Sequence, residues 1–385
     1  MACHPRAVVA ALALSLAACA GSGNPAVSAP PPVAAAPVSC PPQSRPPMGC
    51  ALYPGRLMAL ASGRNRVAPY DTAVAARADL LSFHWDNNVP WELLGACGSD
   101  LDSCTPPRRL RTAHQRQQAF FADAVETLAR QGGIRYVAIN PLDIRRQGVS
   151  DAFEAQQGVR GATAPGADLA DAEVRRRYLD FVRYAVTKFR PAYFSPGIEI
   201  NMYAAERPGD FANLLSLMRE ARDVAHSIDP NIAVAPSIQW EFFKRDRQDA
   251  AVRGALDAML RQWPEIADGL FVSTYPNVFG NKGSIAAADY DFAAAGLPAN
   301  GPLLIAEAGV QPALQADLIA ALVGLGARHD LRGVVWFLVQ DMDRLNIPIP
   351  GLRDIGLFDD SRRDLRPHPG AAVWDGYLAC PARPG

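Results

Sequence analysis

Eight short apolar runs, separated mostly by segments with helical periodicity, constrain the fold of this 385-residue chain more than any other feature. The runs occupy residues 56–61, 79–85, 134–140, 193–202, 232–240, 269–275, 302–309 and 333–340. Parallel strands give such continuous apolar runs when helices cover both faces of their sheet. The number and order of the runs predict one (β/α)8 barrel, the TIM barrel, rather than an open doubly wound sheet. No glycine-rich turn follows the first run, so nothing supports a dinucleotide-binding fold.

Helical periodicity fills most of the intervals between the runs. Apolar residues recur at helical spacing in 112–131, 171–189, 210–228, 252–263, 286–295, 314–326 and 369–378. The clearest pattern is 210–228, where Phe211, Leu215 and Met218 fall on one face of the predicted helix. Residues 141–169 are polar and rich in Gly and Ala, and we expect them to form a mobile loop.

The N-terminus has the pattern of an export signal. A short polar segment precedes the apolar residues 7–18, which are too few to span a bilayer. The apolar run ends in Leu-Ala-Ala followed by Cys19. This pattern resembles the lipobox of bacterial lipoproteins, in which the cysteine is lipidated and becomes the new N-terminus. The alternative is an ordinary secretory signal that is cleaved after Ala18 or Ala20.

We therefore predict a lipoprotein signal peptide at residues 1–18, a disordered tether rich in Pro and Ala at 19–48, and one barrel domain at 49–385. Lipid on Cys19 would attach the protein to a membrane. We expect an exported protein that faces the periplasm or the cell surface, with the outer membrane as its location. The formal net charge of -1 gives no basis for nucleic-acid binding.

Export makes disulfide bonds possible, and five cysteines follow the predicted lipidation site. Cys97 and Cys104 flank a short polar loop, and we predict a bond between them. A bond between Cys50 and Cys380 would join the two ends of the predicted domain and leave Cys40 unpaired, but the sequence does not fix this pairing. No Cys and His residues have the spacing of a zinc site, and we predict neither a metal nor an organic cofactor.

Two glutamates lie near the ends of apolar runs. Glu199 belongs to the fourth run and Glu307 to the seventh. In a TIM barrel the C-terminal ends of the strands meet at one rim, where the active sites of such barrels lie. A carboxyl pair there suits glycosidic cleavage with retention: one protonated carboxyl donates to the leaving oxygen, and the other attacks the anomeric carbon. We assign Glu199 as the acid/base and Glu307 as the nucleophile. The alternative is that both form structural ion pairs inside the barrel.

Other side chains near the strand ends are candidate substrate contacts. Tyr275 ends the sixth run, where its hydroxyl would either reach the predicted nucleophile or cap the barrel in water. Trp336 would stack on a sugar face or pack in the core, and Trp85 would form an outer platform or anchor a loop. Gln239, at the end of the fifth run, is a candidate polar contact. Glu241 is a rival carboxylate, although the charged residues after it favour a solvated helix start.

With these features the sequence resembles the clan A retaining glycoside hydrolases, and the galactanase-like enzymes among them most of all. Residues 197–201 resemble the Gly-Asn-Glu motif on strand four of that family, and residues 305–309 resemble its strand-seven motif. Residues 334–337 resemble the aromatic platform on strand eight, and residues 356–360 the C-terminal end of these barrels. The resemblance implies a (β/α)8 barrel with the acid/base glutamate on strand four and the nucleophile on strand seven.

Two departures from the family pattern stand out. Ile198 occupies the position of the asparagine that hydrogen-bonds the sugar 2-hydroxyl, and residues 80–85 lack the arginine expected on strand two. Asn201, His84 and Asn140 are candidates to replace these polar contacts.

The sequence therefore predicts a retaining glycoside hydrolase that acts on a polysaccharide or oligosaccharide. The alternative, which Ile198 supports, is a non-catalytic carbohydrate-binding barrel lipoprotein in polysaccharide assembly or uptake. A further alternative is a structural envelope lipoprotein in which the rim of the barrel has no ligand.

Overall fold

The computed structural model describes residues 38–42, 44–51, 78–86, 88–131, 133–279, 283–298, 301–337, 341, 352, 354–359 and 366–382. The described residues belong to one compact unit. The predicted signal peptide, the lipidation site and most of the predicted tether lie outside the described residues, and so does the predicted first strand at 56–61.

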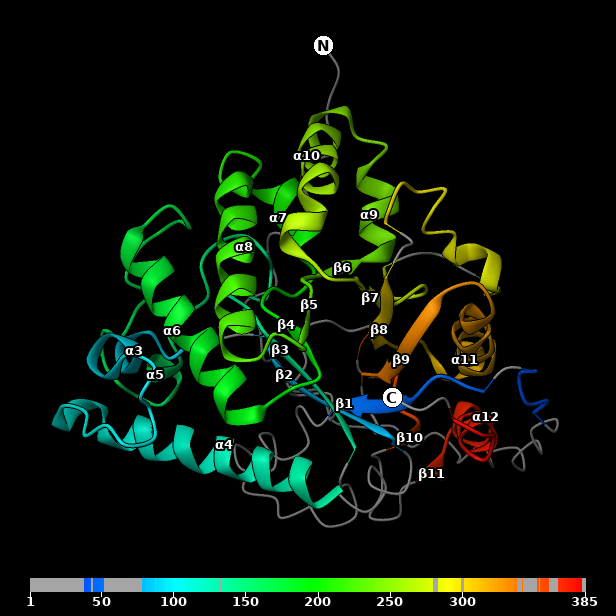
Figure 1. Cartoon of the computed structure of the whole chain (residues 1–385), viewed down its shortest axis with the longest axis horizontal. Coiled ribbons are helices and arrows are strands. Elements are labelled where there is room, and N and C mark those ends of the chain that lie inside the picture. Colours follow the sequence, from blue (N-terminus) through cyan, green and yellow to red (C-terminus); the bar gives the residue numbers. More distant parts are fainter. Residues whose placement is uncertain are drawn as a thin grey trace, which may run out of the picture. The chain divides into compact units, whose positions relative to one another are not determined.

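Nine parallel strands form one curled sheet surrounded by helices (Figure 1). The strands are β1 (Met48–Ala51), β2 (Leu80–Trp85), β3 (Ile134–Ile139), β4 (Tyr193–Ser195), β5 (Ala233–Val234), β6 (Ser237–Gln239), β7 (Leu270–Thr274), β8 (Pro302–Ala308) and β9 (Asp330–Trp336). Their order is β5-β4-β3-β2-β1-β9-β8-β7-β6. The two edge strands, β5 and β6, are consecutive parts of the fifth apolar run, so the sheet has eight strand positions.

The fifth run closes the sheet into a TIM barrel, as predicted. Its first part, β5, pairs with β4, and its second part, β6, pairs with β7. Pro236 lies between the two parts and has no amide to donate to a neighbouring strand. The flanking amides continue the contact with the fourth position, because Ala235 N donates to Phe194 O (3.1 Å) and Ser237 N donates to Gly197 O (2.8 Å).

The first strand position is filled by residues that precede the predicted strand. β1 lies between β2 and β9 and pairs in parallel with both. Just before it, the buried Arg45 donates to the carboxylate of Asp79 (2.5 Å) and to the carbonyl of Cys380 (3.0 Å). The tether predicted to end at residue 48 is therefore too long at its C-terminal end, since these residues belong to the barrel domain.

Helices cover the outside of the barrel largely where the periodicity predicted them. They are α3 (Trp91–Cys97), α4 (Arg111–Gln131), α5 (Phe153–Gln156), α6 (Ala172–Phe189), α7 (Ile200–Glu206), α8 (Phe211–Ile228), α9 (Trp240–Asp246), α10 (Ala250–Ile266), α11 (Gln315–Gly324) and α12 (Pro369–Leu378). Asp171 caps α6 by accepting from Glu173 N (2.8 Å) and Val174 N (3.1 Å). The predicted helical stretch at 286–295 is only a 3₁₀ turn at Ala287–Tyr290. Among the described residues, no helix is both long and apolar enough to cross a membrane.

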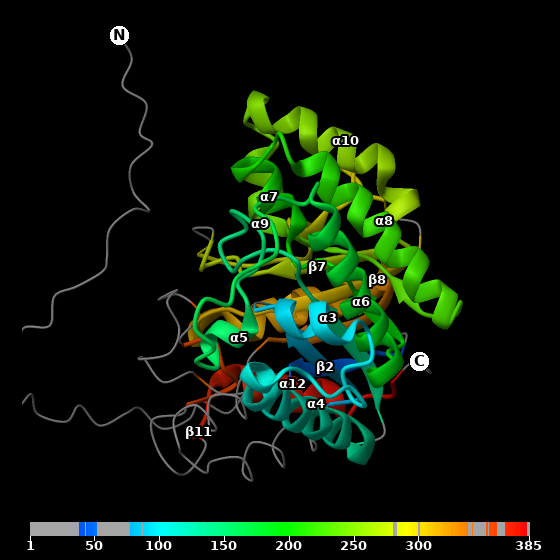
Figure 2. The same ribbon diagram turned by 90° about the vertical axis from the view of Figure 1, so that its left-hand side faces the viewer.

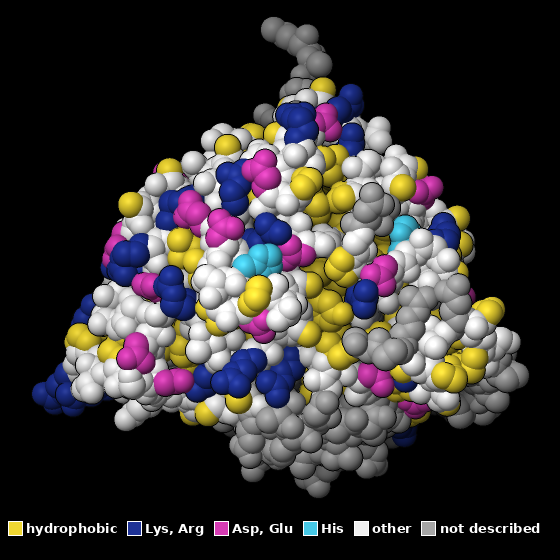
Figure 3. Space-filling view, in the orientation of Figure 1, with side chains coloured by type: hydrophobic (Ala, Val, Ile, Leu, Met, Phe, Trp, Pro, Cys, Tyr) yellow, Lys and Arg dark blue, Asp and Glu magenta, His cyan; other side chains and the backbone are white. Residues whose placement is uncertain are grey.

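The helical layer separates an aromatic core from a charged surface. Strands β2, β7 and β8 lie between α8 and α10 on one side and α4 and α12 on the other (Figure 2). The exposed sides of the helices carry ion pairs, such as Arg175 with Glu220 (2.5 Å) and Arg176 with Glu173 (2.8 Å). Side chains of both charges are interspersed over much of the face shown in Figure 3.

Two disulfide bonds occur among the described residues. The predicted bond between Cys97 and Cys104 is present. The other bond joins Cys40 to Cys380, not Cys50 to Cys380. Cys50 lies within β1, where it pairs with strand residues on both sides. The residue that we expected to remain unpaired in the tether thus fastens the N-terminal end of the domain to the region after α12.

We expect loss of the Cys40–Cys380 bond to lower the free energy of unfolding by about 2–5 kcal/mol, because the bond constrains nearly the whole unfolded chain. The measurement is urea unfolding of the variant with Cys40→Ser and Cys380→Ser. The control replaces Cys97 and Cys104, whose separation is 7 residues instead of 340, and it should cost less. A control variant that loses as much stability as the first would contradict this expectation.

Candidate active site at the C-terminal rim

The two predicted glutamates lie at the C-terminal ends of the fourth and seventh strand positions. Glu307 belongs to β8 and pairs with Ser273 of β7, whereas Glu199 follows β4 and directly precedes α7. Both are buried: 8% of the surface of Glu199 and 5% of the surface of Glu307 is exposed. Because the strands are parallel, these ends form one rim of the barrel, which we call the C-terminal rim.

The backbone of Glu199 has an uncommon conformation. Its φ of 54° and ψ of 43° lie in the left-handed region, which non-glycine residues seldom occupy. The Glu199 amide donates to the hydroxyl of Ser237 in β6 (2.9 Å), and this bond ties the conformation to the closure of the barrel. Such conformations persist where the surrounding structure fixes them, and they cluster at functional sites.

The carboxylate of Glu307 has one partner from each of two other strand positions. Tyr275, directly after β7, donates its hydroxyl to Oε2 (2.6 Å). Nδ1 of His84, in β2, lies 2.9 Å from Oε1, although neither ring nitrogen makes an aligned hydrogen bond to the described residues. Burial, followed by the charge of Glu307, raises the pKa of Tyr275 well above its usual value, so its hydroxyl keeps the proton that it donates.

A buried arginine connects Glu199 to a third carboxyl. Arg146, in the loop after β3, is 2% exposed. Its Nη2 lies 2.9 and 3.0 Å from the two carboxyl oxygens of Asp86 and 3.2 Å from Oε2 of Glu199. Asn140 donates to Asp86 Oδ1 (2.8 Å) from the other side. One guanidinium is thus shared by two carboxyls at the C-terminal rim.

Neither Asp86 nor Arg146 was predicted from the sequence. Asp86 follows β2 directly, so the rule that selected the two glutamates would have selected it as well. Arg146 lies in a loop without periodicity, and the only signal for it was the missing arginine on strand two. That loop is joined to the segment after β2, because the hydroxyl of Ser150 accepts the amides of Asn88 and Val89 (2.8 and 3.2 Å).

Burial and like charges give Glu199 an unusual proton affinity. Burial raises its pKa to about 8; the charge of Arg146 opposes this shift, and the carboxylates of Glu307 and Asp86 add to it. Burial also raises the pKa of Asp86, against the pull of Arg146. Three carboxyls share a region with one permanent cation, so ionising all of them is unfavourable. Among these carboxyls the pKa of Glu199 is raised to about 8, which favours its protonated form.

Two predicted aromatic platforms do not face the rim. Trp336 is fully buried, donates to Ile355 O (2.8 Å) and packs against Trp374 of α12. Trp85 is 4% exposed and stacks on Phe121 of α4 with ring centroids 4.8 Å apart. Successive residues of a strand point to opposite faces, and both tryptophans point outward to the helices. The half-buried Phe337, next to Trp336, instead lies near the rings of His84 and Tyr275 at the C-terminal rim.

Two predicted polar contacts are structural. Asn201 is fully buried and makes two hydrogen bonds with the backbone of Gln239: Nδ2 donates to its carbonyl (3.0 Å) and Oδ1 accepts its amide (2.8 Å). The side chain of Gln239 caps α9 by accepting Phe242 N (2.7 Å). Both side chains are fully buried and bonded to backbone groups.

Asn140 and Glu241 make hydrogen bonds with other residues near the C-terminal rim, and Ile198 is buried there. Asn140 is buried. Its Oδ1 accepts the amide of Ile198 (3.4 Å), and its Nδ2 donates to Asp86, so both ends of the side chain have protein partners. Ile198 itself is 1% exposed. Glu241 lies in the first turn of α9, the helix start that the sequence suggested, where it is half-buried and accepts from Thr274 Oγ1 (2.7 Å) and Tyr275 N (3.0 Å).

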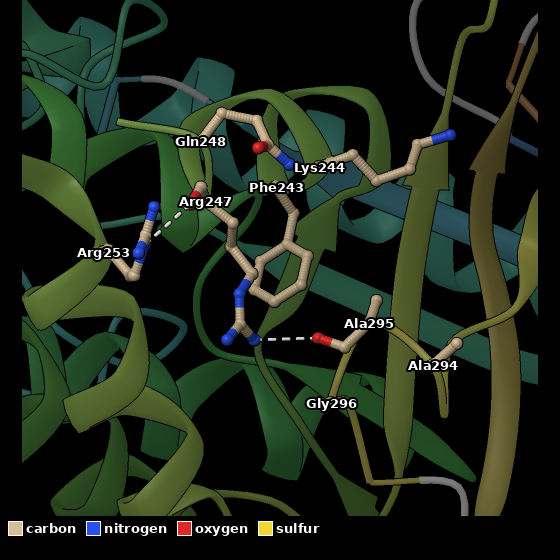
Figure 4. A pocket seen from close by; sticks show the side chains of 8 residues that line it. All are labelled: Phe243, Lys244, Arg247, Gln248, Arg253, Ala294, Ala295 and Gly296. Carbon is tan, nitrogen blue, oxygen red and sulfur yellow. Dashed lines mark hydrogen bonds between the residues drawn. The ribbon is translucent and has the colours of Figure 1, made fainter. Parts of the chain in front are cut away.

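No other feature among the described residues matches the chemistry of this rim. No group of three or more His, Cys, Asp or Glu residues there is arranged to hold a metal ion. A pocket of about 570 Å³ lies on the flank of the barrel, between the end of α9, the start of α10 and residues 294–296 (Figure 4). Its Arg247 is held by Ala295 O (2.8 Å) and by Asp257 (3.1 Å), and none of the predicted site residues lines it.

No protein-family model and no curated protein matches this chain. Solved structures resemble it in fold. A GH5_18 glycoside hydrolase from Streptomyces cattleya in complex with GlcNAc has a TM-score of 0.60 at 16% identity, covering 89% of this chain and 83% of that one. A variant of that protein in complex with Manβ1-4GlcNAc gives 0.57 at 16% identity, covering 88% and 83%. A GH5_18 protein from Bifidobacterium longum subsp. infantis gives 0.56 at 15% identity, covering 89% and 81%. The feature that this chain shares with them is the (β/α)8 barrel fold.

Proposed function

We propose that this protein is a retaining glycoside hydrolase, with Glu199 as its acid/base and Glu307 as its nucleophile. The observation that carries the proposal is the contrast between two buried carboxyls at one rim. Burial raises the pKa of Glu199 to about 8, while Glu307 accepts a hydrogen bond from Tyr275. A proton donor and a carboxylate at one site are what cleavage through a covalent glycosyl intermediate requires.

In the first step an oxygen of Glu307 attacks the anomeric carbon. The bond to the leaving oxygen breaks, and that oxygen takes the proton of Glu199. Tyr275 orients the Glu307 carboxylate through its 2.6 Å bond to Oε2, which keeps the attacking group in one position. In the second step water attacks the same carbon, the carboxylate of Glu199 takes the proton of that water, and Glu307 leaves.

We propose a polysaccharide or oligosaccharide as the substrate, in line with the galactanase-like resemblance of residues 197–201 and 305–309. Two structures of the same fold hold GlcNAc and Manβ1-4GlcNAc, which favours a glycan over other ligands. A non-catalytic carbohydrate-binding barrel is the second candidate. It is favoured by the buried Ile198 and by the burial of Asn201, since the polar contacts expected for a 2-hydroxyl are missing at both positions.

Glu307→Gln separates the two candidates. In an enzyme the variant should lose turnover of aryl glycosides by at least about 10³-fold, because the amide cannot form the covalent intermediate. A binding protein would retain its affinity for glycans, and its wild type would show no turnover. Glu154→Gln is the matched control: it changes a buried glutamate that accepts the amide of Leu93 and lies outside the carboxyl cluster.

The pH dependence of kcat/KM tests the role of Glu199. With a substrate whose leaving group needs protonation, kcat/KM should fall as the pH rises through the pKa of Glu199, about 8, because the carboxylate cannot donate. The direction follows from the raised pKa, which keeps the donor protonated up to that pH. The same limb should be missing in Glu199→Gln. If it persists unchanged in that variant, another group is the acid.

We also propose that Cys19 carries a lipid that anchors the protein to a membrane, with the outer membrane as the expected site. The support is the Leu-Ala-Ala-Cys pattern at residues 16–19 behind an apolar run. Cells grown with labelled palmitate should yield a labelled protein, and Cys19→Ala should remove the label. A wild-type protein without label, cleaved after residue 18 or 20, would point to an ordinary secretory signal.

A further inference from the structure

The loop that carries Arg146 fixes the position of its guanidinium at the C-terminal rim. Its backbone is left-handed, with φ of 58°. The turn is closed by Arg146 N donating to Asp143 O (2.9 Å) and by Asp143 N donating to Gly148 O (3.0 Å). The Asp143 carboxylate also accepts the amides of Arg145 and Gln147 (2.8 and 3.0 Å). An uncommon conformation that so many bonds fix directs the guanidinium to one place.

The guanidinium meets its two carboxyls through a single nitrogen. Nη2 serves both Asp86 and Glu199, whereas Nη1 donates to Asp143 O (3.1 Å) and Nε has no partner among the described residues. Burial opposes the charge of Arg146, but the carboxylates of Asp86 and Glu199 raise its pKa, so it remains a cation. A fixed cation between two carboxyls stabilises whichever of them is ionised.

The charges that face Glu199 change during the proposed reaction. Arg146 comes from the loop after β3, Asp86 from the end of β2, Glu307 from β8, Glu241 from α9, and the uncharged Tyr275 from the end of β7. When Glu307 becomes a glycosyl ester it loses its negative charge. One of the repulsions that keep the proton on Glu199 then disappears, while the attraction of Arg146 remains.

We propose that Arg146 is a positioning residue that holds Glu199 as a carboxylate in the second step, while Asp86 holds the guanidinium when Glu199 is protonated. The inference rests on the proposed retaining mechanism and deepens it. In the step concerned, the water oxygen bonds to the anomeric carbon and the bond from that carbon to Glu307 breaks, its electron pair returning to the carboxylate. The water proton goes to Glu199, whose ionised form Arg146 supports.

The two steps therefore depend differently on Arg146. The first step needs protonated Glu199, and a cation beside it gives no help. The second step needs ionised Glu199 in an environment that is otherwise acidic and buried. Removing the cation should slow the second step and leave the first largely intact. Removing a residue that only maintained the fold would slow both steps.

The test uses the full-length protein with dinitrophenyl β-mannoside, β-galactoside and β-glucoside, whose leaving group needs no proton. For Arg146→Met we expect kcat to fall on the order of ten- to a hundredfold and KM to fall with it, so that kcat/KM is retained. A burst of dinitrophenolate should precede the slow phase. Azide should restore kcat, because it attacks the intermediate without a base. Arg146→Lys should keep most of kcat.

With aryl glycosides whose leaving group needs a proton, the basic limb of kcat/KM gives a second arm with opposite signs. Arg146→Met removes a cation beside Glu199 and should move the basic limb of kcat/KM to higher pH. Asp86→Asn removes a like charge and leaves the guanidinium to Glu199 alone, so it should move the limb to lower pH. The matched control is Arg222→Met, which breaks a pair with Asp268 on the flank and should change neither the limb nor the burst.

The outcomes are distinct. If wild type turns over none of the dinitrophenyl glycosides, the proposed function fails and the role of Arg146 fails with it. If wild type is active but Arg146→Met lowers kcat and kcat/KM equally, with no burst and no azide rescue, only the role of Arg146 is overturned. If Arg146→Met does not fold, Asp86→Asn decides, and an unshifted limb in that variant overturns the inference.

Discussion

Ser237 joins the closure of the barrel to the placement of the acid/base candidate. Its amide donates to Gly197 O (2.8 Å), its hydroxyl accepts the amide of Glu199 (2.9 Å), and its strand pairs with Phe271 of β7. One residue thus connects the fourth, fifth and sixth strand positions where the sheet would otherwise have two edges. The left-handed backbone of Glu199 is tied to this connection through the hydrogen bond from its amide to Ser237.

Charge imbalance at the rim follows from the same closure. Bringing the ends of β2, β4 and β8 to one rim places Asp86, Glu199 and Glu307 near a single buried arginine. Burying several charges is costly unless each is paired. Burial and these like charges raise the pKa of Glu199, and a protonated Glu199 is what the proposed first step uses. The proposed chemistry therefore arises from an electrostatic arrangement that the fold imposes.

The parts of the site that the sequence revealed are those that depend on position along a strand. Glu199, Glu307 and Tyr275 end apolar runs, and the barrel brings all such ends to one rim. The errors depend on orientation. Trp85 and Trp336 also lie at strand ends but point outward, and a run that is apolar on both faces gives no sign of which side a residue faces. The pairing of Cys40 with Cys380 was likewise hidden, because their chain positions say nothing of their distance in the fold.

The sequence by itself determined the (β/α)8 architecture and the strand positions of the two glutamates, because hydrophobic periodicity and the order of elements depend on local pattern alone. Only the tertiary structure decided which side chains surround them. Arg146 reaches Glu199 across 53 residues of chain, and Asn201 turns from a free polar group into a partner of the Gln239 backbone. The reason is physical: burial, like-charge repulsion and hydrogen-bond partners depend on distances between segments, and those distances exist only once the barrel is closed.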